Sequence, residues 1–490
     1  MNRSHLLGAL GLALLLSCCS SGTARRDSPA DPEKSISVSR LRDRVDSLLA
    51  DSALSSSFVG VKVISLEDGK VLIQQNAGKL FHPASNMKLL TSAAGLHILG
   101  SRVAFTTRFA SDSPLERGRP AGNISVRGDG DPMMTASDLD SVAARMFAQG
   151  IRRVTGDIVG DVTAFDSIPW GSGWMWDDEP SSDEPFISPL SVNGNSATVR
   201  VWPGRSIGMP GRIELVPATK FATIVNSVIT SPDTNGAPVT VIRNHGENIV
   251  RVSGRIHPRG EAQDFQISIW QPALYFLTLF RESMERAGIE VDGGTRLDTT
   301  VGRFTLASID RPMDSVLHRI NKPSDNLAAE NMLRKMAAAR WKTGAGAAGG
   351  LAILKEYLAS CAVDTVPMIL ADGSGVSFYN AISPAAIVRL LQVQYQDKTT
   401  FPMFYESLPI AGVDGTLKNR MRGTRAARNV HAKTGTITGV SALSGYVTTA
   451  DGKMLAFSIM CNHFPARVHF LREMQDEIME LLARTSLSSQ

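Results

Sequence analysis

The segment Phe81-His82-Pro83-Ala84-Ser85-Asn86-Met87-Lys88 decides how the rest of this sequence is interpreted. It leads into a Leu- and Ala-rich stretch that predicts a helix opened by Ser85 and running to about Leu99. Residues three apart share a helix face, so the Ser85 hydroxyl should lie beside the Lys88 amine. Such an amine can activate the weakly nucleophilic hydroxyl if burial and a cationic setting lower its pKa. Taken alone, an S-x-x-K pattern is better explained by an N-cap serine and a solvated lysine.

Two further patterns follow in a fixed order: Ser324-Asp325-Asn326, then Lys433-Thr434-Gly435 with Thr436 after it. The first begins a helix expected from Leu327 to Met336, and the second lies on a predicted strand edge. Alone, the first pattern would merely cap its helix and the second would be an exposed strand. The three patterns together form the signature of serine acyl-enzymes that act on penicillins and D-alanyl peptides.

Further residues between and beside these patterns sharpen the match. Phe81-His82-Pro83-Ala84 precedes the first pattern, and Asp372-Gly373-Ser374-Gly375 lies between the second and third. On these residues the chain resembles the low-molecular-mass class C penicillin-binding proteins, the D-alanyl-D-alanine carboxypeptidase/endopeptidase family. The resemblance extends over nearly the whole mature chain.

The resemblance implies a role for each motif residue. Ser85 is expected to be the nucleophile and Lys88 its base, while Ser324 relays a proton to the leaving amine. Asn326 is expected to bind the substrate backbone, and Asp325 to be structural.

The third pattern is expected to bind the leaving side of the substrate. The charge of Lys433 and the hydroxyl of Thr434 suit a terminal carboxylate, and Gly435 lets substrate approach the strand backbone. The resemblance also implies that the backbone amides of Ser85 and Thr436 form the oxyanion hole.

Some positions depart from the family pattern or have more than one interpretation. The family often has an arginine where this chain has Phe378, which puts any substrate contact of that arginine in doubt. Asp178, with Asp177 as the fallback, matches an acid that meets the amino group of the peptidoglycan diamino acid; a solvated acidic loop is the alternative. His82 and His431 flank two of the motifs, but neither is required once Lys88 is available.

The N-terminus has the features of a targeting segment. Arg3 precedes the apolar run Leu6 to Leu16, which is too short to span a membrane stably. The run ends in Leu15-Leu16-Ser17-Cys18, which resembles a bacterial lipoprotein cleavage box with Cys18 as the lipidated residue. An ordinary signal peptide cut between Cys18 and Ala24 is the alternative. A Ser-, Ala-, Asp- and Pro-rich tether follows, and no other segment is long and apolar enough to span a membrane.

The whole-chain composition excludes several classes of protein. The chain has 490 residues, of which 43% are hydrophobic and 20% charged, with a formal net charge of +4. These values indicate a soluble globular protein of two or three domains. No basic cluster indicates nucleic acid, no Cys/His spacing indicates a metal site, and no cofactor is expected. Cys361 and Cys461 leave a disulfide open, although a buried free thiol fits Cys461 better.

The predicted elements give an α/β (α+β) fold. A helix over Ser39 to Ala53 and a hairpin near the N-terminus match a hairpin and a helix over Ala466 to Leu482 at the C-terminus. Together they predict one antiparallel sheet covered by the terminal helices. By resemblance this is the sheet of a serine β-lactamase/transpeptidase-like core with a large inserted domain that carries a nested small β domain.

The expected boundaries follow from these elements. A signal peptide of the lipoprotein type is expected over 1–18 and a linker over 19–36. The transpeptidase-like domain is expected in two segments, 37–100 and 305–490. The inserted domain between them is also divided, into 101–196 and 266–304, with the nested β domain at 197–265.

The sequence therefore predicts a serine D-alanyl-D-alanine carboxypeptidase of the bacterial cell envelope, periplasmic and lipid-anchored at Cys18. It would also cleave D-alanyl-diaminopimelate crosslinks. Its partners would be peptidoglycan stem peptides and crosslinks, with β-lactams as inhibitors and a membrane contact only through the anchor. The alternatives are a β-lactamase, which needs a way to activate the deacylating water, and a non-catalytic wall-binding or penicillin-sensing protein.

Overall fold

The computed structural model describes residues 35–114, 121–299, 302–464 and 467–488. Residues Ser35–Gln490 form one compact unit. The predictions of a signal peptide, a linker and lipidation at Cys18 fall within residues 1–36, nearly all of which lie outside the described residues.

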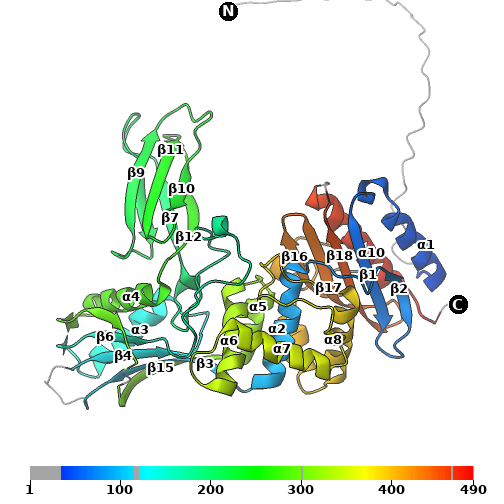
Figure 1. The fold of residues 1–490 in the computed structure, drawn as a ribbon. Helices are drawn as coiled ribbons and strands as arrows, with labels where there is room; N and C mark the ends of the chain where they lie inside the picture. Colours follow the sequence, from blue (N-terminus) through cyan, green and yellow to red (C-terminus); the bar gives the residue numbers. More distant parts are fainter. Residues whose placement is uncertain (1–34, 115–120, 300–301, 465–466, 489–490) are drawn as a thin grey trace, which may run out of the picture. The chain divides into compact units, whose positions relative to one another are not determined.

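The two ends of the described chain build one five-stranded antiparallel sheet, in the order β16-β17-β18-β1-β2 (Figure 1). Helices α1 (Val38–Leu49) and α10 (Val468–Arg484) pack against each other, and α10 packs on the sheet. This confirms the sheet predicted from the two hairpins and the two terminal helices. The strands are β1 (Phe58–Ser65), β2 (Val71–Gln75), β16 (His431–Ile437), β17 (Val440–Thr448) and β18 (Met454–Asn462).

Both faces of the sheet are covered, which explains why β17 and β18 are apolar at nearly every position. Alternate residues such as Leu443 and Phe457 pack under the terminal helices, whereas Ala442 and Met460 pack against a second layer of helices. A strand buried on both faces has a continuous apolar sequence.

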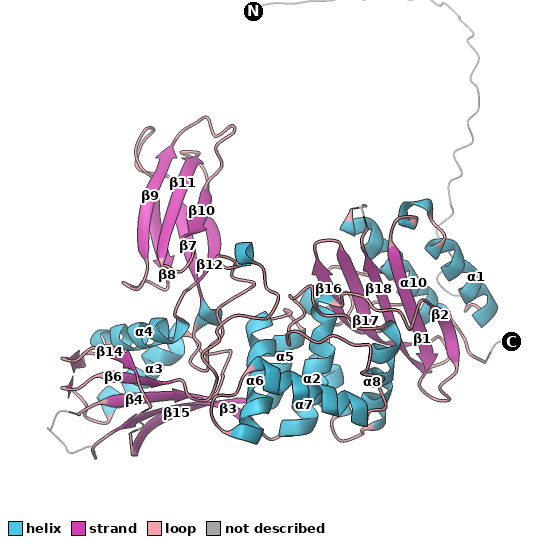
Figure 2. Ribbon diagram, in the orientation of Figure 1, coloured by secondary structure: helices cyan, strands magenta, loops and turns pink. Residues whose placement is uncertain are grey.

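The second layer is helical, with α2 (Met87–Leu99) at its centre (Figure 2). Every residue of α2 from Met87 to Leu96 is buried, because α5, α6, α7 and α8 all contact it. The surrounding helices are α5 (Met313–Asn321), α6 (Asn326–Trp341), α7 (Ala347–Ser360), α8 (Pro384–Gln396) and α9 (Phe401–Ser407).

A second sheet, in the order β14-β6-β4-β3-β15, lies between α2 and α5 in the sequence. Helices α3 (Ala136–Ala148) and α4 (Pro272–Arg286) pack together and share a core with it. Two short strands, β5 (Arg153–Val154) and β13 (Glu290–Val291), form a separate parallel pair. The sheet strands are β3 (Ala104–Ser111), β4 (Ile124–Gly128), β6 (Ile158–Asp161), β14 (Thr295–Leu297) and β15 (Phe304–Pro312).

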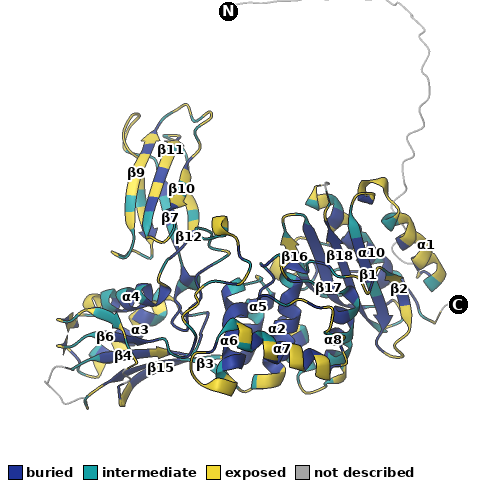
Figure 3. Cartoon of the chain, in the orientation of Figure 1, coloured by how far each residue is buried: buried dark blue, intermediate teal, exposed yellow. Residues whose placement is uncertain are grey.

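Six more strands lie between β6 and α4, in two three-stranded sheets ordered β10-β11-β9 and β12-β7-β8. Much of β9 and β10 is exposed (Figure 3), as expected of thin sheets with solvent on one face. The strands are β7 (Ser196–Trp202), β8 (Arg212–Val216), β9 (Thr223–Thr230), β10 (Thr240–Arg243), β11 (Ile249–Ile256) and β12 (Gln263–Ser268).

Cys361 and Cys461 are both buried free thiols, which confirms the interpretation that favoured a free Cys461 over a disulfide. Within the described ranges, no helix is both long and apolar enough to cross a membrane.

Candidate active site

Ser85 lies in a short 3₁₀ turn, Ala84–Asn86, directly before α2. Ala84 has a φ of 45°, a left-handed conformation that costs free energy in a residue with a Cβ. Two glycines allow neighbouring segments to pack closely against this turn. A Cβ on Gly375 would lie 1.9 Å from the Ala84 carbonyl oxygen, and a Cβ on Gly435 would lie 2.7 Å from the Pro83 carbonyl oxygen. The backbone around Ser85 therefore fits only because both neighbouring segments lack a side chain there.

Lys88 lies one helical turn after Ser85 and is fully buried. Its Nζ is 3.0 Å from the Ser85 Oγ and also donates to the Ser374 carbonyl oxygen, at 2.7 Å, and to Asn326 Oδ1. Burial lowers the pKa of Lys88 to about 8, and the negative charge of Asp372 opposes that shift. With that pKa, about a tenth of the amine is in the neutral form that a base requires at pH 7, far more than for an ordinary lysine.

Lys433 lies on β16, the edge strand beside Ser85, and is also fully buried. Its Nζ donates to the Ser324 Oγ at 2.9 Å and to the Thr434 carbonyl oxygen at 2.8 Å. Burial, and then the charge of Lys88, holds the pKa of Lys433 well below its ordinary value. The prediction that Lys433 meets a substrate carboxylate stays a prediction; without a substrate, its amine is hydrogen-bonded to Ser324.

The Ser324-Asp325-Asn326 segment starts α6. Asp325 Oδ1 accepts the Ala328 backbone N–H at 2.8 Å, and its carboxylate pairs with Arg319 at 2.6 Å, which is the structural role expected of Asp325. Asn326 bonds Lys88 through Oδ1 and donates its Nδ2 to the Asp183 carbonyl oxygen at 2.6 Å. The second motif therefore touches both Lys88 and a loop of the inserted region, which is the part of the chain between α2 and α5.

Sequence reasoning missed Glu330, a buried carboxylate under the site. Glu330 Oε1 accepts the backbone N–H groups of Gly373 and Ser374 at 2.8 and 2.9 Å, and Oε2 pairs with Arg334 at 3.1 Å. These bonds fix the Ser374 carbonyl that Lys88 contacts. Burial, and then the nearby charge of Asp372, raises the pKa of Glu330. The signal was available, since Glu330 lies four residues after Asn326 on the same helix face.

The Asp372-Gly373-Ser374-Gly375 turn links the cleft to the inserted region. Asp372 accepts the Gly375 N–H at 2.8 Å and the Ser377 N–H at 2.7 Å, and the Trp174 indole N–H at 3.0 Å. Trp174 belongs to the Trp174-Met175-Trp176 segment of the inserted region. A single buried carboxylate thus joins the catalytic turn to the loop that was expected to select the substrate.

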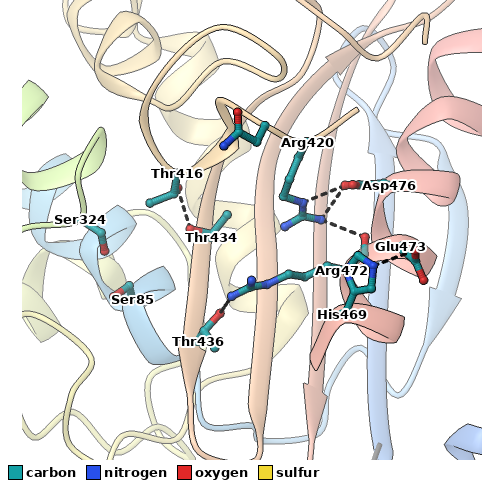
Figure 4. Close-up of a pocket in the computed structure, with 11 residues that line it drawn as sticks. Ser85, Ser324, Thr416, Arg420, Thr434, Thr436, His469, Arg472, Glu473 and Asp476 are labelled. Atoms are coloured by element: carbon teal, nitrogen blue, oxygen red, sulfur yellow. Dashed lines mark hydrogen bonds and ion pairs between the residues drawn. The ribbon is translucent and has the colours of Figure 1, made fainter. Parts of the chain in front are cut away.

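A cavity of about 580 Å³ opens in front of Ser85 (Figure 4). The Thr434 hydroxyl is hydrogen-bonded to that of Thr416 at 2.7 Å. Four of the predicted motif residues, Ser85, Ser324, Thr434 and Thr436, are in its lining, whereas Asn326 lines a neighbouring pocket. The other residues of the lining are Thr416, Asn419, Arg420, His469, Arg472, Glu473 and Asp476.

Asp178 is not part of that lining. It ends the turn Trp176–Asp178, where its carboxylate accepts the Met175 backbone N–H at 2.8 Å. The acid of the same loop that interacts electrostatically with Lys88 is Glu184, whose pKa burial raises to about 7. The structure therefore brings Ser85, Lys88 and the other two motifs together, and it leaves Asp178 on the neighbouring loop.

The two histidines and Phe378 have other neighbours. His82 bonds the Asn380 carbonyl oxygen through Nδ1, at 3.1 Å, and its ring meets that of Phe378 edge-on. His431 stacks on Tyr405 with ring centroids 4.0 Å apart, and burial lowers its pKa. Across the described parts of the chain, His, Cys, Asp and Glu side chains form no group of three that could hold a metal ion.

Comparison with known proteins agrees with this geometry. The chain matches the D-Ala-D-Ala carboxypeptidase 3 (S13) family over residues 41–485. A D-alanyl-D-alanine carboxypeptidase of Actinomadura sp. (strain R39) is 34% identical over 442 residues, which cover 87% of this chain and 81% of that protein. The D-alanyl-D-alanine carboxypeptidase DacB of Haemophilus influenzae is 27% identical over 83% of this chain and 86% of that protein.

A solved structure shows the same fold. The crystal structure of penicillin binding protein 4 from Haemophilus influenzae superimposes with a TM-score of 0.80 at 24% sequence identity, covering 90% of this chain and 99% of that chain. This confirms the predicted mixed fold.

Proposed function

Because this chain belongs to the D-Ala-D-Ala carboxypeptidase 3 (S13) family, it is a serine-type D-alanyl-D-alanine carboxypeptidase, and we propose that Ser85 is its nucleophile and Lys88 its base. The observation that carries the assignment is the 3.0 Å contact between the Lys88 Nζ and the Ser85 Oγ, with the amine buried and its pKa lowered. Neutral Lys88 takes the hydroxyl proton as Ser85 Oγ attacks the carbonyl carbon of the penultimate D-alanine.

The remaining motif residues act on the other atoms of the reaction. The backbone N–H groups of Ser85 and Thr436 stabilise the oxyanion. Ser324, bonded to Lys433 at 2.9 Å, passes a proton to the departing amine as the C–N bond breaks. Asn326 orients the substrate backbone, and Thr434 binds on the leaving side. Water then hydrolyses the Ser85 ester, which releases the shortened peptide and restores the hydroxyl.

A penicillin-labelling experiment tests the nucleophile. Penicillin should form a stable adduct on the peptide that contains Ser85, detected by mass spectrometry, and Ser85→Ala should abolish both the adduct and D-alanine release. An adduct on another residue, or full activity of the variant, contradicts the assignment. Rapid turnover of penicillin would instead favour a β-lactamase, and neither adduct nor turnover would favour a non-catalytic binding protein.

The substrate is proposed to include peptidoglycan crosslinks as well as terminal D-alanyl-D-alanine. In both, the Ser85 acyl group is a D-alanyl residue and only the leaving amine differs. The penicillin binding protein 4 structure from Haemophilus influenzae has also been solved with a beta-lactam bound, which supports β-lactams as inhibitors of this fold. Product analysis of purified crosslinked muropeptides tests the proposal: monomers indicate endopeptidase activity, and loss of terminal D-alanine alone indicates a pure carboxypeptidase.

Location is a separate proposal, of a periplasmic protein anchored by lipid at Cys18. It rests on the leader sequence, because an apolar run followed by Leu15-Leu16-Ser17-Cys18 resembles a lipoprotein box. Cys18→Ser should move the protein from the membrane fraction to the soluble periplasm. Retention of the variant in the membrane fraction would indicate another anchor.

A further inference from the structure

An arginine from the last helix reaches the cavity wall beside the third motif. Arg472, on α10, extends towards Thr436, and its Nη2 is 3.4 Å from the Thr436 Oγ (Figure 4). Both residues line the cavity that contains Ser85 and Ser324. The arginine is exposed, so its charged head is available to a molecule in that cavity.

The acids around Arg472 already have other partners. Glu473 pairs with His469 at 3.1 Å, and Asp476 pairs with Arg420 at 2.6 Å. The first turn of α10 contains no acidic residue. Among the described residues that line the cavity, Arg472 is therefore a cation without an ion pair.

Lys433, which the sequence predicted to meet the carboxylate, is not in the lining of this cavity and already has other partners. Lys433 is fully buried and donates to Ser324 and to its own neighbouring carbonyl. A substrate carboxylate beside Thr434 and Thr436 would therefore meet the hydroxyls of these threonines and the guanidinium of Arg472.

We propose that Arg472 determines specificity for the leaving group, by pairing with the α-carboxylate of the D-amino acid that departs. The inference rests on the proposed acyl transfer at Ser85, which puts the leaving group on the Thr434–Thr436 side. A planar guanidinium suits a carboxylate because it can donate two parallel hydrogen bonds. The same group recognises free D-alanine and the carboxylate on the D-centre of a crosslinking diamino acid, so one residue serves both substrates.

Arg420 is a positioning residue for this contact. Its guanidinium donates to the Arg472 carbonyl oxygen at 3.1 Å, to Gln475 Oε1 at 3.2 Å and to Asp476 at 2.6 Å. These bonds fix the turn of α10 from which Arg472 projects. Because Arg420 has only 13% of its side chain exposed and is bonded on several sides, it is not itself free to bind a carboxylate.

The test pairs variants with two substrates that differ by one charge. Wild type, Arg472→Gln and Arg472→Lys are assayed on acyl peptides that end in D-alanyl-D-alanine, with the terminal carboxylate either free or converted to an amide. Arg472→Gln should lower kcat/KM for the free carboxylate by about tenfold and leave the amide unchanged, with Arg472→Lys between wild type and Arg472→Gln. High ionic strength should reduce the preference of the wild type for the carboxylate.

Arg44→Gln is the matched control. Arg44 lies on α1 and pairs with Glu477 of α10 at 3.0 Å, outside the cavity lining, so the variant changes the same charge near the same helix. It should leave both substrates unaffected. If Arg472→Gln lowers kcat/KM equally for both substrates, or for neither, the inference about Arg472 is overturned and the proposed function is not affected. A wild type that neither releases D-alanine nor forms an adduct at Ser85 overturns the proposed function as well.

Discussion

The two sides of the cleft are built in different ways. On the side of α2, α6 and β16, Lys88 and Lys433 are fully buried, and each donates hydrogen bonds to fixed partners in other motifs. On the side of the inserted region, Trp176 is 75% exposed, and the Asp178 carboxylate accepts a hydrogen bond from its own turn. One side has buried amines with fixed hydrogen-bond partners, and the other presents exposed side chains to solvent.

The difference separates chemistry from selection. Burying two amines costs free energy, which the fold offsets with hydrogen bonds. As a result, the base of the proposed mechanism has a lowered pKa and a fixed position before substrate arrives. A solvated loop stores no such free energy and gains an interaction only when a substrate covers it. Substitutions on the buried side should therefore affect every substrate, whereas those on the loop should affect only substrates that reach it.

The largest expected effect comes from removing the base. Lys88→Ala should lower the rate of acylation by roughly 10²- to 10⁴-fold for peptide and penicillin alike, because both need the Ser85 hydroxyl deprotonated. Stopped-flow acylation with a reporter penicillin measures the rate. A near-normal rate would show that Lys88 is not the base. It would also contradict the proposal that the buried side of the cleft carries out the chemistry.

Glu330, which bonds the turn that contacts Lys88, should contribute mainly to the stability of the fold. Glu330→Ala leaves Arg334 buried without its charge partner, and loss of one member of a buried pair costs about 3–5 kcal/mol. Denaturant unfolding measures the loss in the free energy of unfolding. Glu356→Ala is the control, because it breaks the exposed Arg340–Glu356 pair, which should contribute at most about 1 kcal/mol. Similar losses in the two variants would contradict the picture of a buried, preorganised side.

The pH profile tests the same side without mutation. A base with a pKa of about 8 is neutral only above that pH, so acylation should rise by about fiftyfold between pH 6 and pH 8 and then level off. Glu184 stabilises the charged form of Lys88, so Glu184→Gln should lower that pKa and move the rise to lower pH. A flat profile over this range would show that Lys88 does not titrate as the base.

The sequence could predict those features of the fold and the site that follow from residue spacing and apolar patterns. Spacing alone indicated that Ser85 and Lys88 share a helix face, and apolar hairpins with helices at both ends indicated one sheet. The 3.0 Å contact between the two residues and the order of the five strands agree with those expectations. The spacing of Ser85 and Lys88 is fixed by local helix periodicity, whereas the pairing of β1 with β18 was inferred from the matching elements at the two ends of the chain.

Long-range contacts were harder to predict. Nothing in the sequence places the Trp174 indole against Asp372, because the two residues meet only through the folding of the inserted region. Arg472 was missed for the same reason: on α10 it resembles one more charged residue of an amphipathic helix, and only the packing of α10 on the sheet brings it to Thr436. The contact between the Lys433 Nζ and the Ser324 Oγ joins two motifs far apart in the sequence, so it could not be deduced from a short motif either.

The smallest effect is expected from the loop, and it should be confined to one substrate class. We propose that Asp178 moves from its turn to pair with the side-chain ammonium of a diamino acid, an interaction that gains free energy only if the bound peptide partly excludes water. Asp178→Ala should then reduce kcat/KM for peptides that carry this ammonium by about tenfold, equivalent to about 1.4 kcal/mol. Penicillin, which lacks the ammonium, should acylate the variant normally. The steady-state ratio of the two substrates is the measurement. Asp177→Ala tests the fallback position on the same turn, and a selective loss in that variant alone would assign the contact to Asp177. Equal losses on both substrates would indicate that the carboxylate merely holds its turn through the Met175 N–H. No loss on either would leave a solvated loop, and the selection of substrate would then depend on the opposite wall.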